Sequence, residues 1–196
     1  MSKSKIHDSA EAAKILTVAR RYVFTHGFRT FTMDTLAAEA DIGKKVIYTH
    51  FHGKQLLLEA LIIAKVADMD RDLTAAQEAG GNFSKQMHAM FSVLREHAEE
   101  YSEPFIQDLL EVSPAFFEWT KNKRTQLLTG HFAKLFAQGR REGAIRSDIS
   151  DDLFMTIYEM LTSGILMGRI LKKTDTTVAE IYNQTVSILL EGTLKR

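Results

Sequence analysis

The chain of 196 residues contains no cysteine and only two prolines. Without thiols it has no disulfide, no thiolate zinc site and no cysteine nucleophile, and this composition is consistent with a reducing compartment. Proline breaks helices, whereas Ala, Leu, Glu, Lys and Gln, which are frequent here, favour them. The composition therefore predicts an all-α fold.

Long apolar runs are missing as well. No apolar segment follows the first five residues, so we expect no secretory signal. The most apolar later stretch, residues 161–171, is shorter than the ~20 residues that a membrane-spanning helix needs. We expect a cytoplasmic protein with no membrane partner.

Neither sign of charge is in excess, since the formal net charge is zero. The distribution is nevertheless uneven: residues 1–54 hold nine Lys or Arg and five Asp or Glu, and the remainder holds sixteen and twenty. A basic N-terminal part joined to an acidic remainder suits a protein that presents one end to phosphate groups.

Common enzyme signatures are also missing. The sequence has no HExxH motif, no glycine-rich phosphate loop and no convincing pair of nucleophile and base. His88, His97 and His131 each lack a second ligand at metal-compatible spacing, so we interpret them as structural or surface residues. We expect no enzyme, no metal site and no cofactor.

Residues 31–51 are the stretch in which spacing, turn chemistry and charge together indicate a mechanism. Thr32 is a suitable N-cap for a short helix, and Asp41-Ile42-Gly43 breaks that helix. A second short helix, from Lys44 to about Phe51, carries two lysines at its start. Two short helices, a three-residue turn and a basic outer face are typical of a helix-turn-helix. One face of the first helix is formed by Met33, Leu36, Ala37 and Ala40, and one face of the second by Ile47 and Phe51.

The run from Phe28 to Leu57 resembles the DNA-binding domain of TetR-family transcriptional repressors and covers about the first quarter to third of the chain. The resemblance implies a homodimer that binds a DNA operator and a small-molecule effector. It is carried by Phe31, Thr32, Met33, Leu36, Ala37, Ile42, Tyr48, Phe51 and Lys54.

The helical periodicity divides the chain into three helices in residues 1–53, here called the head, and about six in residues 54–196, here called the body. We expect the head to be a helix-turn-helix DNA-binding domain and the body a helical ligand-binding and dimerisation domain. The head should begin with a capping box of Asp8 and Glu11, and its first helix should stop at Gly27. The body helices are expected at residues 54–79, 83–101, 103–110, 115–141 and 153–173 and from Thr177 onward.

The second short helix of the motif is expected to read DNA. Lys44 and Lys45 stand where contact with base edges is expected, and Val46 could contact a thymine methyl group. The resemblance implies phosphate contacts by Thr32, Tyr48, Thr49, His50 and Lys54. This sequence departs from the common family pattern at Gly43 and Lys45. The alternative is that these side chains are ordinary solvated surface.

The aromatic content of the body admits two interpretations. An apolar ligand pocket between helices would use Phe91, Phe105, Phe116, Trp119, Phe132, Phe154 and Tyr158. The alternative is that most of them form the core, because apolar residues at helical spacing are first of all packing. The unknown effector is expected to be apolar or aromatic.

The last two helices are candidates for the homodimer interface. Gly164 and Gly168 stand four residues apart, which permits close approach of helices. The resemblance implies that these two helices pair with their counterparts in a second subunit, and we include Ile181 and Ile188 in this interface. A two-fold dimer would read a palindromic operator.

Together these features predict a ligand-responsive repressor. A ligand in the body would shift the helix of residues 54–79 and so change the distance between the two recognition helices. The alternative is a helical small-molecule-binding or scaffold protein without specific DNA binding.

Overall fold

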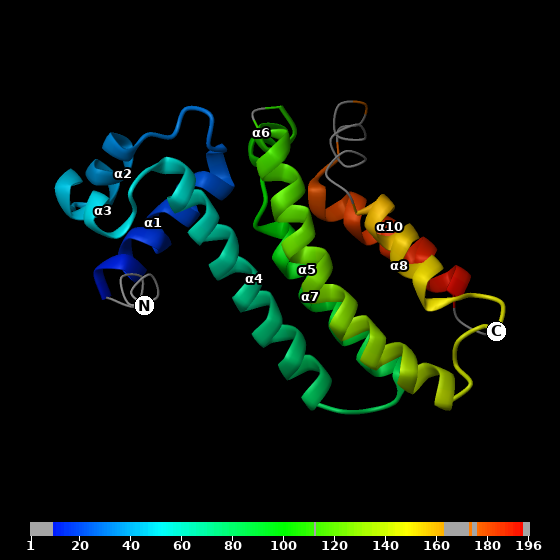
Figure 1. Ribbon diagram of the computed structural model, residues 1–196. Coiled ribbons are helices and arrows are strands. Elements are labelled where there is room, and N and C mark those ends of the chain that lie inside the picture. Colours follow the sequence, from blue (N-terminus) through cyan, green and yellow to red (C-terminus); the bar gives the residue numbers. More distant parts are fainter. Residues whose placement is uncertain (1–9, 112, 163–172, 174–175, 194–196) are drawn as a thin grey trace.

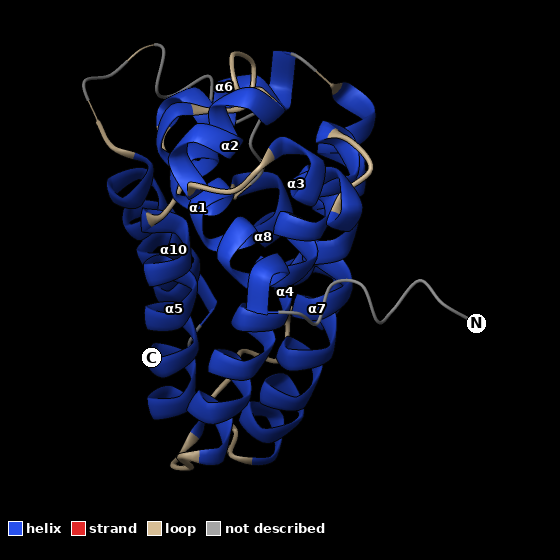
Figure 2. Ribbon diagram, turned by 90° about the vertical axis from the view of Figure 1, so that its left-hand side faces the viewer, coloured by secondary structure: helices blue, strands red, loops and turns tan. Residues whose placement is uncertain are grey.

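The computed structural model describes residues 10–111, 113–162, 173 and 176–193. Within these ranges all regular secondary structure is helical, and none of these residues lies in a β-strand (Figure 2), which confirms the all-α prediction. The helices are α1 (Ala10–His26), α2 (Met33–Ala40), α3 (Lys44–His50), α4 (Lys54–Glu78), α5 (Phe83–Glu99), α6 (Glu103–Glu111), α7 (Pro114–Arg141), α8 (Asp151–Leu161) and α10 (Val178–Thr193).

Helices α1, α2 and α3 pack on one another at one end of the molecule (Figure 1). Thr32 is the N-cap of α2, because its side chain accepts a hydrogen bond from the backbone of Thr35. The turn between α2 and α3 depends on Asp41, whose φ of 50° lies in the left-handed region. The predicted helix-turn-helix is therefore present with its predicted bounds.

The body is a bundle in which α4, α5 and α7 run side by side away from the head, and α8 and α10 pack beyond α5 and α7 (Figure 1). Polar N-caps fix where several of these helices begin: the side chains of Asn82, Ser113 and Ser150 each accept a backbone hydrogen bond. Thr177 and Glu180 form the predicted capping box of α10, with Glu180 N donating to Thr177 Oγ1 at 3.2 Å and Thr177 N donating to Glu180 Oε2 at 2.9 Å.

Some predictions fall outside the described residues. These are the Asp8 half of the first capping box and the pair Gly164 and Gly168. Of the helix expected at residues 153–173, the structure describes α8, which ends at Leu161 with Thr162 as its C-cap. Residues 163–172 of this expectation lie outside the described residues. No helix of the described ranges is long and apolar enough to cross a membrane.

Two aromatic residues of the head, Phe24 and Phe28, lie at its junction with the body. The ring of Phe24 is 4.9 Å from that of Phe105 on α6, and the ring of Phe28 is 5.9 Å from that of Phe116 on α7. Both are buried. The head is too small to enclose them, so these rings join it to the body rather than complete a separate core. Leu36, Ile47 and Phe51, which lie on the predicted helix faces, are buried, and so is Ile15 of α1.

Candidate functional site

Helix α3 is anchored to the head by a single fully buried side chain, Ile47, and by Phe51 at its C-cap. The remaining surface of α3 is exposed or half-buried, and both lysines at its N-terminal end are exposed. The short turn from α2 thus presents a basic helix end to solvent, which is the geometry that major-groove reading requires.

The two lysines at the start of α3 differ in their surroundings. Lys44 Nζ lies 2.6 Å from Asp34 Oδ1 on α2, and this hydrogen-bonded carboxylate raises the pKa of Lys44. No ion pair of Lys45 is found within the described ranges. Among the described residues, Lys44 therefore has an acidic partner and Lys45 has none.

The expected phosphate-binding residues fall into two groups. Thr32, Tyr48 and Thr49 are exposed, and Thr49 Oγ1 donates to the carbonyl oxygen of Lys45 at 3.0 Å. His50 and Lys54 are half-buried. His50 Nε2 lies 3.3 Å from Glu11 Oε2, and Lys54 Nζ donates to the carbonyl oxygen of Arg29 at 3.3 Å. Val46 is also half-buried on this helix.

Desolvation by burial lowers the pKa of Lys54, while the charge of Asp108 acts in the opposite direction. In this conformation Lys54 supports the loop that connects α1 and α2. A contact between Lys54 and phosphate requires this side chain to turn outward.

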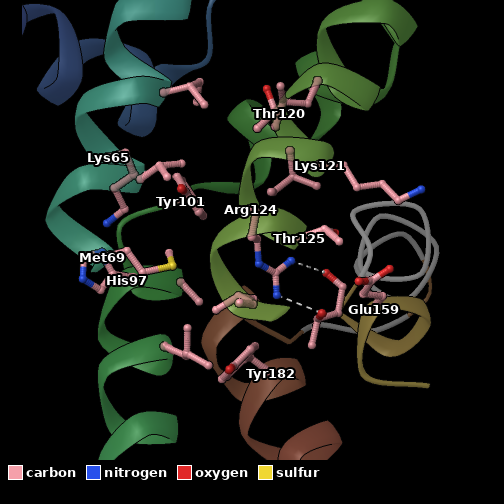
Figure 3. A pocket seen from close by; sticks show the side chains of 18 of the residues that line it. Lys65, Met69, His97, Tyr101, Thr120, Lys121, Arg124, Thr125, Glu159 and Tyr182 are labelled. Carbon is pink, nitrogen blue, oxygen red and sulfur yellow. Dashed lines mark hydrogen bonds between the residues drawn. The ribbon is translucent and has the colours of Figure 1, made fainter. Parts of the chain in front are cut away.

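The body encloses a cavity of about 130 Å³ between α4, α5, α6, α7, α8 and α10 (Figure 3). Its wall is mostly apolar and includes Met69, Leu94, Ile106, Leu109 and Leu128. A concave, largely apolar space with a few polar groups is the usual form of a small-molecule site.

Of the seven aromatic residues predicted for a ligand pocket, only Phe105 and Tyr158 line this cavity. Phe91, Phe132 and Phe154 pack with Tyr158 in one aromatic cluster, and all three are buried. Phe116 stacks with Trp119 at 5.8 Å. For these five residues the packing interpretation describes the structure better than the pocket interpretation.

The polar groups of the cavity were missed by the sequence interpretation. Arg124 of α7 donates from Nη2 to Tyr158 Oη at 3.0 Å and to Thr162 Oγ1 at 2.9 Å, and from Nη1 to the carbonyl oxygen of Thr162 at 3.3 Å. The periodicity of α7 holds the signal that could have found it, because Phe117, Thr120, Arg124 and Leu128 follow a helical stripe and all line the cavity.

A chain of charges runs from the cavity to the head. Lys65 of α4 lines the cavity, is 1% exposed and donates to Glu100 Oε1. Glu100 Oε2 accepts from Arg20 of α1, and Arg20 also pairs with Asp68 at 2.6 Å. Desolvation by burial lowers the pKa of Lys65. The pKa of Glu100 is lowered too, because its hydrogen bonds to Lys65 and Arg20 outweigh the opposing effect of burial.

In the part of the chain that the structure describes, two buried polar atoms on residues that line the cavity have no hydrogen-bond partner: His97 Nδ1 and Thr120 Oγ1. The other ring nitrogen of His97, Nε2, lies 3.0 Å from Asp72 Oδ2. Desolvation and the nearby charge of Lys65 lower the pKa of His97, so the neutral imidazole is favoured. His131, by contrast, has partners at both nitrogens, Gln77 and Asp70. Over the described ranges no group of three or more His, Asp or Glu side chains could hold a metal ion.

The two isoleucines predicted for the dimer interface differ in exposure. Ile181 of α10 is 4% exposed and belongs to the core of its own chain, so it offers little surface to a partner. Ile188, two turns further along α10, is 71% exposed. On α8, Leu153 and Met160 are 49% and 66% exposed and stand seven residues apart. This spacing puts them on one face of α8.

Residues 15–61 match the model of the bacterial regulatory proteins of the tetR family. Over 141 residues the chain is 24% identical to the HTH-type transcriptional regulator YhgD of Bacillus subtilis, covering 70% of this chain and 74% of the relative.

Solved structures share the fold over nearly the whole chain. The regulatory protein TetR from Rhodobacter sphaeroides has a TM-score of 0.74 at 14% identity and covers 94% of this chain and 100% of its own. SmeT of Stenotrophomonas maltophilia, the repressor of the multidrug efflux pump SmeDEF, has a TM-score of 0.70 at 15% identity and covers 97% and 93%.

Proposed function

The chain belongs to the TetR family of bacterial regulatory proteins and is a DNA-binding transcriptional regulator, and we propose that it is a ligand-responsive repressor which binds a palindromic operator as a homodimer. Regulators of this family bind DNA and small-molecule effectors and are not enzymes. The observation that carries the proposal is that the N-terminal end of α3, which directly follows the turn at Asp41, is basic and exposed. A bacterial repressor works on the chromosome, so its place would be the cytoplasm.

We assign the reading of base edges mainly to Lys45, because it has no internal ion pair in the described ranges, with Lys44 and Val46 beside it. Exposed Thr32, Tyr48 and Thr49 would hold the phosphates that flank the groove. His50 and Lys54 would join them after leaving Glu11 and the carbonyl oxygen of Arg29. Residues 1–53 would form the DNA-binding domain, and residues 54–196 the ligand-binding and dimerisation domain.

The proposed effector site is the cavity, and α4 is the proposed link to DNA. Four residues of α4, Ile62, Lys65, Val66 and Met69, line the cavity, and the same helix begins at Lys54 directly after the recognition helix. A ligand that favours one position of α4 would change the separation of the two recognition helices, with a coupling of about 1–3 kcal/mol. SmeT is named as a repressor, which supports the proposal that this chain represses transcription rather than activates it.

The homodimer is proposed to form through α8 and α10. Leu153, Met160 and Ile188 leave apolar surface exposed on these two helices. Gly164 and Gly168 remain part of the prediction. A two-fold axis through this face would place two heads on one palindrome.

The DNA assignment is tested by selecting bound sites from random double-stranded DNA with the purified chain. A recovered palindrome supports both specific binding and the dimer. Lys45→Ala should lose preference for the selected site over random DNA, by about 1–3 kcal/mol at one base pair. Lys54→Ala should weaken binding to all sequences and reduce the salt slope by about one unit.

The control is Lys85→Ala, which removes an exposed lysine on α5, and it should leave both quantities unchanged. Negligible, salt-insensitive binding by the unaltered chain would favour the alternative of a helical ligand-binding or scaffold protein without specific DNA binding.

A further inference from the structure

Among the described residues of the cavity lining, three basic side chains and one acidic side chain are charged, and only two of these four form ion pairs. Lys65 is paired with Glu100, and Lys121 lies 3.4 Å from Glu118 at the exposed side of α7. Arg124 and Glu159 are the other two charged residues of the lining. For neither is an ion pair found in the part of the chain that the structure describes.

Arg124 is the cation that the cavity leaves without an anion. It is half-buried, and among the described residues its hydrogen-bond acceptors are neutral oxygens of Tyr158 and Thr162. Figure 3 labels Arg124 and marks hydrogen bonds of its guanidinium with dashed lines. These bonds use Nη1 and Nη2, and none of them leads to a carboxylate. A cation removed from water and not paired with an anion is costly, and a bound anion would remove that cost.

Thr120 is a second, independent indication at the same wall. It precedes Arg124 by four residues on α7, so the two side chains are neighbours on one face of the helix. Its hydroxyl is buried and has no hydrogen-bond partner among the described residues, although Thr120 lines the cavity. A hydroxyl can donate to a carboxylate oxygen that the neighbouring guanidinium also binds.

Beyond this polar corner the wall is apolar. Met69, Leu94, Phe105, Ile106, Leu109 and Leu128 contribute to it. We propose that the cavity binds an apolar organic acid, whose carboxylate pairs with Arg124 and accepts a hydrogen bond from Thr120 while its apolar part lies against this wall. The proposal rests on the effector site proposed above and names the chemical class of the effector.

The carboxylate of Glu159 also lines the cavity and offers the alternative that the cavity binds a cation. If Glu159 determined the binding preference, the ligand would be an amine. Arg124 is favoured because its guanidinium already reaches from α7 to α8, and its Nε–H and one N–H of Nη1 have no acceptor among the described residues and so can donate to a carboxylate. Glu159 has no hydroxyl neighbour comparable to Thr120 among the unpartnered buried atoms of the described residues.

The test is calorimetric titration of the full chain with three probes of the same length: octanoate, octanamide and octylamine. The unaltered chain should bind octanoate about 10- to 100-fold more tightly than octanamide, because charge-assisted hydrogen bonds are lost in the amide. Octylamine should bind no better than octanamide. Arg124→Met should abolish the preference for the acid, and Arg124→Lys should retain part of it.

Thr120→Val keeps the shape of the side chain and removes only the hydroxyl, so it should weaken octanoate binding severalfold without affecting octanamide. Thr120→Ser should restore binding. Lys134→Met is the control on the same helix, since it removes an exposed charge of α7 away from the cavity lining, and it should leave the preference intact.

Equal affinity for acid and amide, or a preference for the amine, overturns the proposal. Arg124 also joins α7 to α8, so the Met variant could fail to fold; the three probes on the unaltered chain and the Thr120 variants then decide the question alone. Operator binding without ligand is measured in parallel. Intact operator binding with no acid preference contradicts only this inference, whereas acid binding without operator binding contradicts only the proposed function.

Discussion

Asp108 of α6 and Arg29 of the loop that follows α1 are joined by two hydrogen bonds: Arg29 N donates to Oδ2 at 2.7 Å and Arg29 Nε to Oδ1 at 3.1 Å. Phe28 N donates to the same Oδ2 at 2.7 Å. One buried carboxylate of the body thus holds the backbone of the head just before the helix-turn-helix. Three other residues of α6, Phe105, Ile106 and Leu109, line the cavity. This helix therefore contacts both the ligand site and the head.

Gly27 permits the close approach of this loop to Asp108. Its φ is +78°, and a Cβ atom there would collide with Asp108 Oδ2. Gly27→Ala should therefore lower the free energy of unfolding by more than the strain of a left-handed alanine alone. Gly80→Ala is the matched control, because Gly80 has a φ of +69° and no neighbouring atom lies within 4 Å of the place that an alanine methyl group would take.

We expect about 1–2 kcal/mol for Gly80→Ala, from backbone strain, and about 1–3 kcal/mol more for Gly27→Ala, from the hydrogen bonds that the displaced carboxylate loses. Chemical denaturation measures both. If the two variants were equally stable, the contact between Gly27 and Asp108 would not constrain the loop.

Asp108→Ala tests the same junction from the side of the body. Two backbone N–H groups would lose their acceptor, and the free energy of unfolding should fall by about 2–4 kcal/mol. Glu111→Ala is the control on the same helix, since the ion pair that Glu111 forms with Arg29, at 2.9 Å, is exposed. Its effect should be small. A loss of stability as large in Glu111→Ala as in Asp108→Ala would assign the junction to the ion pair instead.

Local signals explain why the helix-turn-helix could be predicted and the junction could not. Thr32, Asp41 and Ile47 act on neighbours within a few residues, so spacing alone identifies their roles. Asp108 bonds to residues about 80 positions away, and no local pattern reveals which backbone groups a buried carboxylate will meet. For the same reason no local pattern reveals that the ring of Phe28 packs against Phe116 of the body.

The cavity shows a related limit. Aromatic residues at helical spacing mark buried surface, but packing decides whether that surface faces another ring or an empty space. Phe132 and Phe154 face each other at 5.7 Å, while Phe105 faces the cavity. Polar residues would have been better markers of the cavity. Arg124 lies on the inward face of α7, where a charged residue is unusual unless it meets a polar partner in the interior.

His97 predicts a pH dependence of stability. Burial and the charge of Lys65 lower its folded pKa below the ordinary value of 6.5, although Asp72 and Glu100 act in the opposite direction. The stabilisation that a neutral His97 gives the folded protein is therefore complete above pH 6.5, the ordinary pKa that applies in the unfolded chain. It is lost as the pH falls toward the lower pKa of the folded protein. His97→Gln should flatten the decrease in unfolding free energy between about pH 7 and pH 5.

His88→Gln is the control for this measurement, because His88 is exposed on the same helix α5 and should leave the pH profile unchanged. The carboxylates with lowered pKa values, Glu100 and Asp68, have ordinary values of 4.5 and 3.8, so their loss of stability lies at lower pH. An unchanged slope in His97→Gln above pH 5 would mean that His97 is protonated in the folded protein without cost.

The exposed apolar surface of α8 and α10 leads to a prediction about assembly. If Ile188 and Met160 form the proposed dimer face, Ile188→Glu and Met160→Glu should convert the dimer to a monomer, because each places a charge in an apolar interface. Operator affinity should then fall steeply, since a single head reads only one half-site. Ile63→Glu, at an isoleucine of α4 that is 54% exposed, should leave the dimer intact. Analytical ultracentrifugation of the three variants distinguishes the outcomes. A dimer that survives both Ile188→Glu and Met160→Glu would place the interface elsewhere on the chain. Dissociation of Ile63→Glu would show that α4 takes part in the dimer interface.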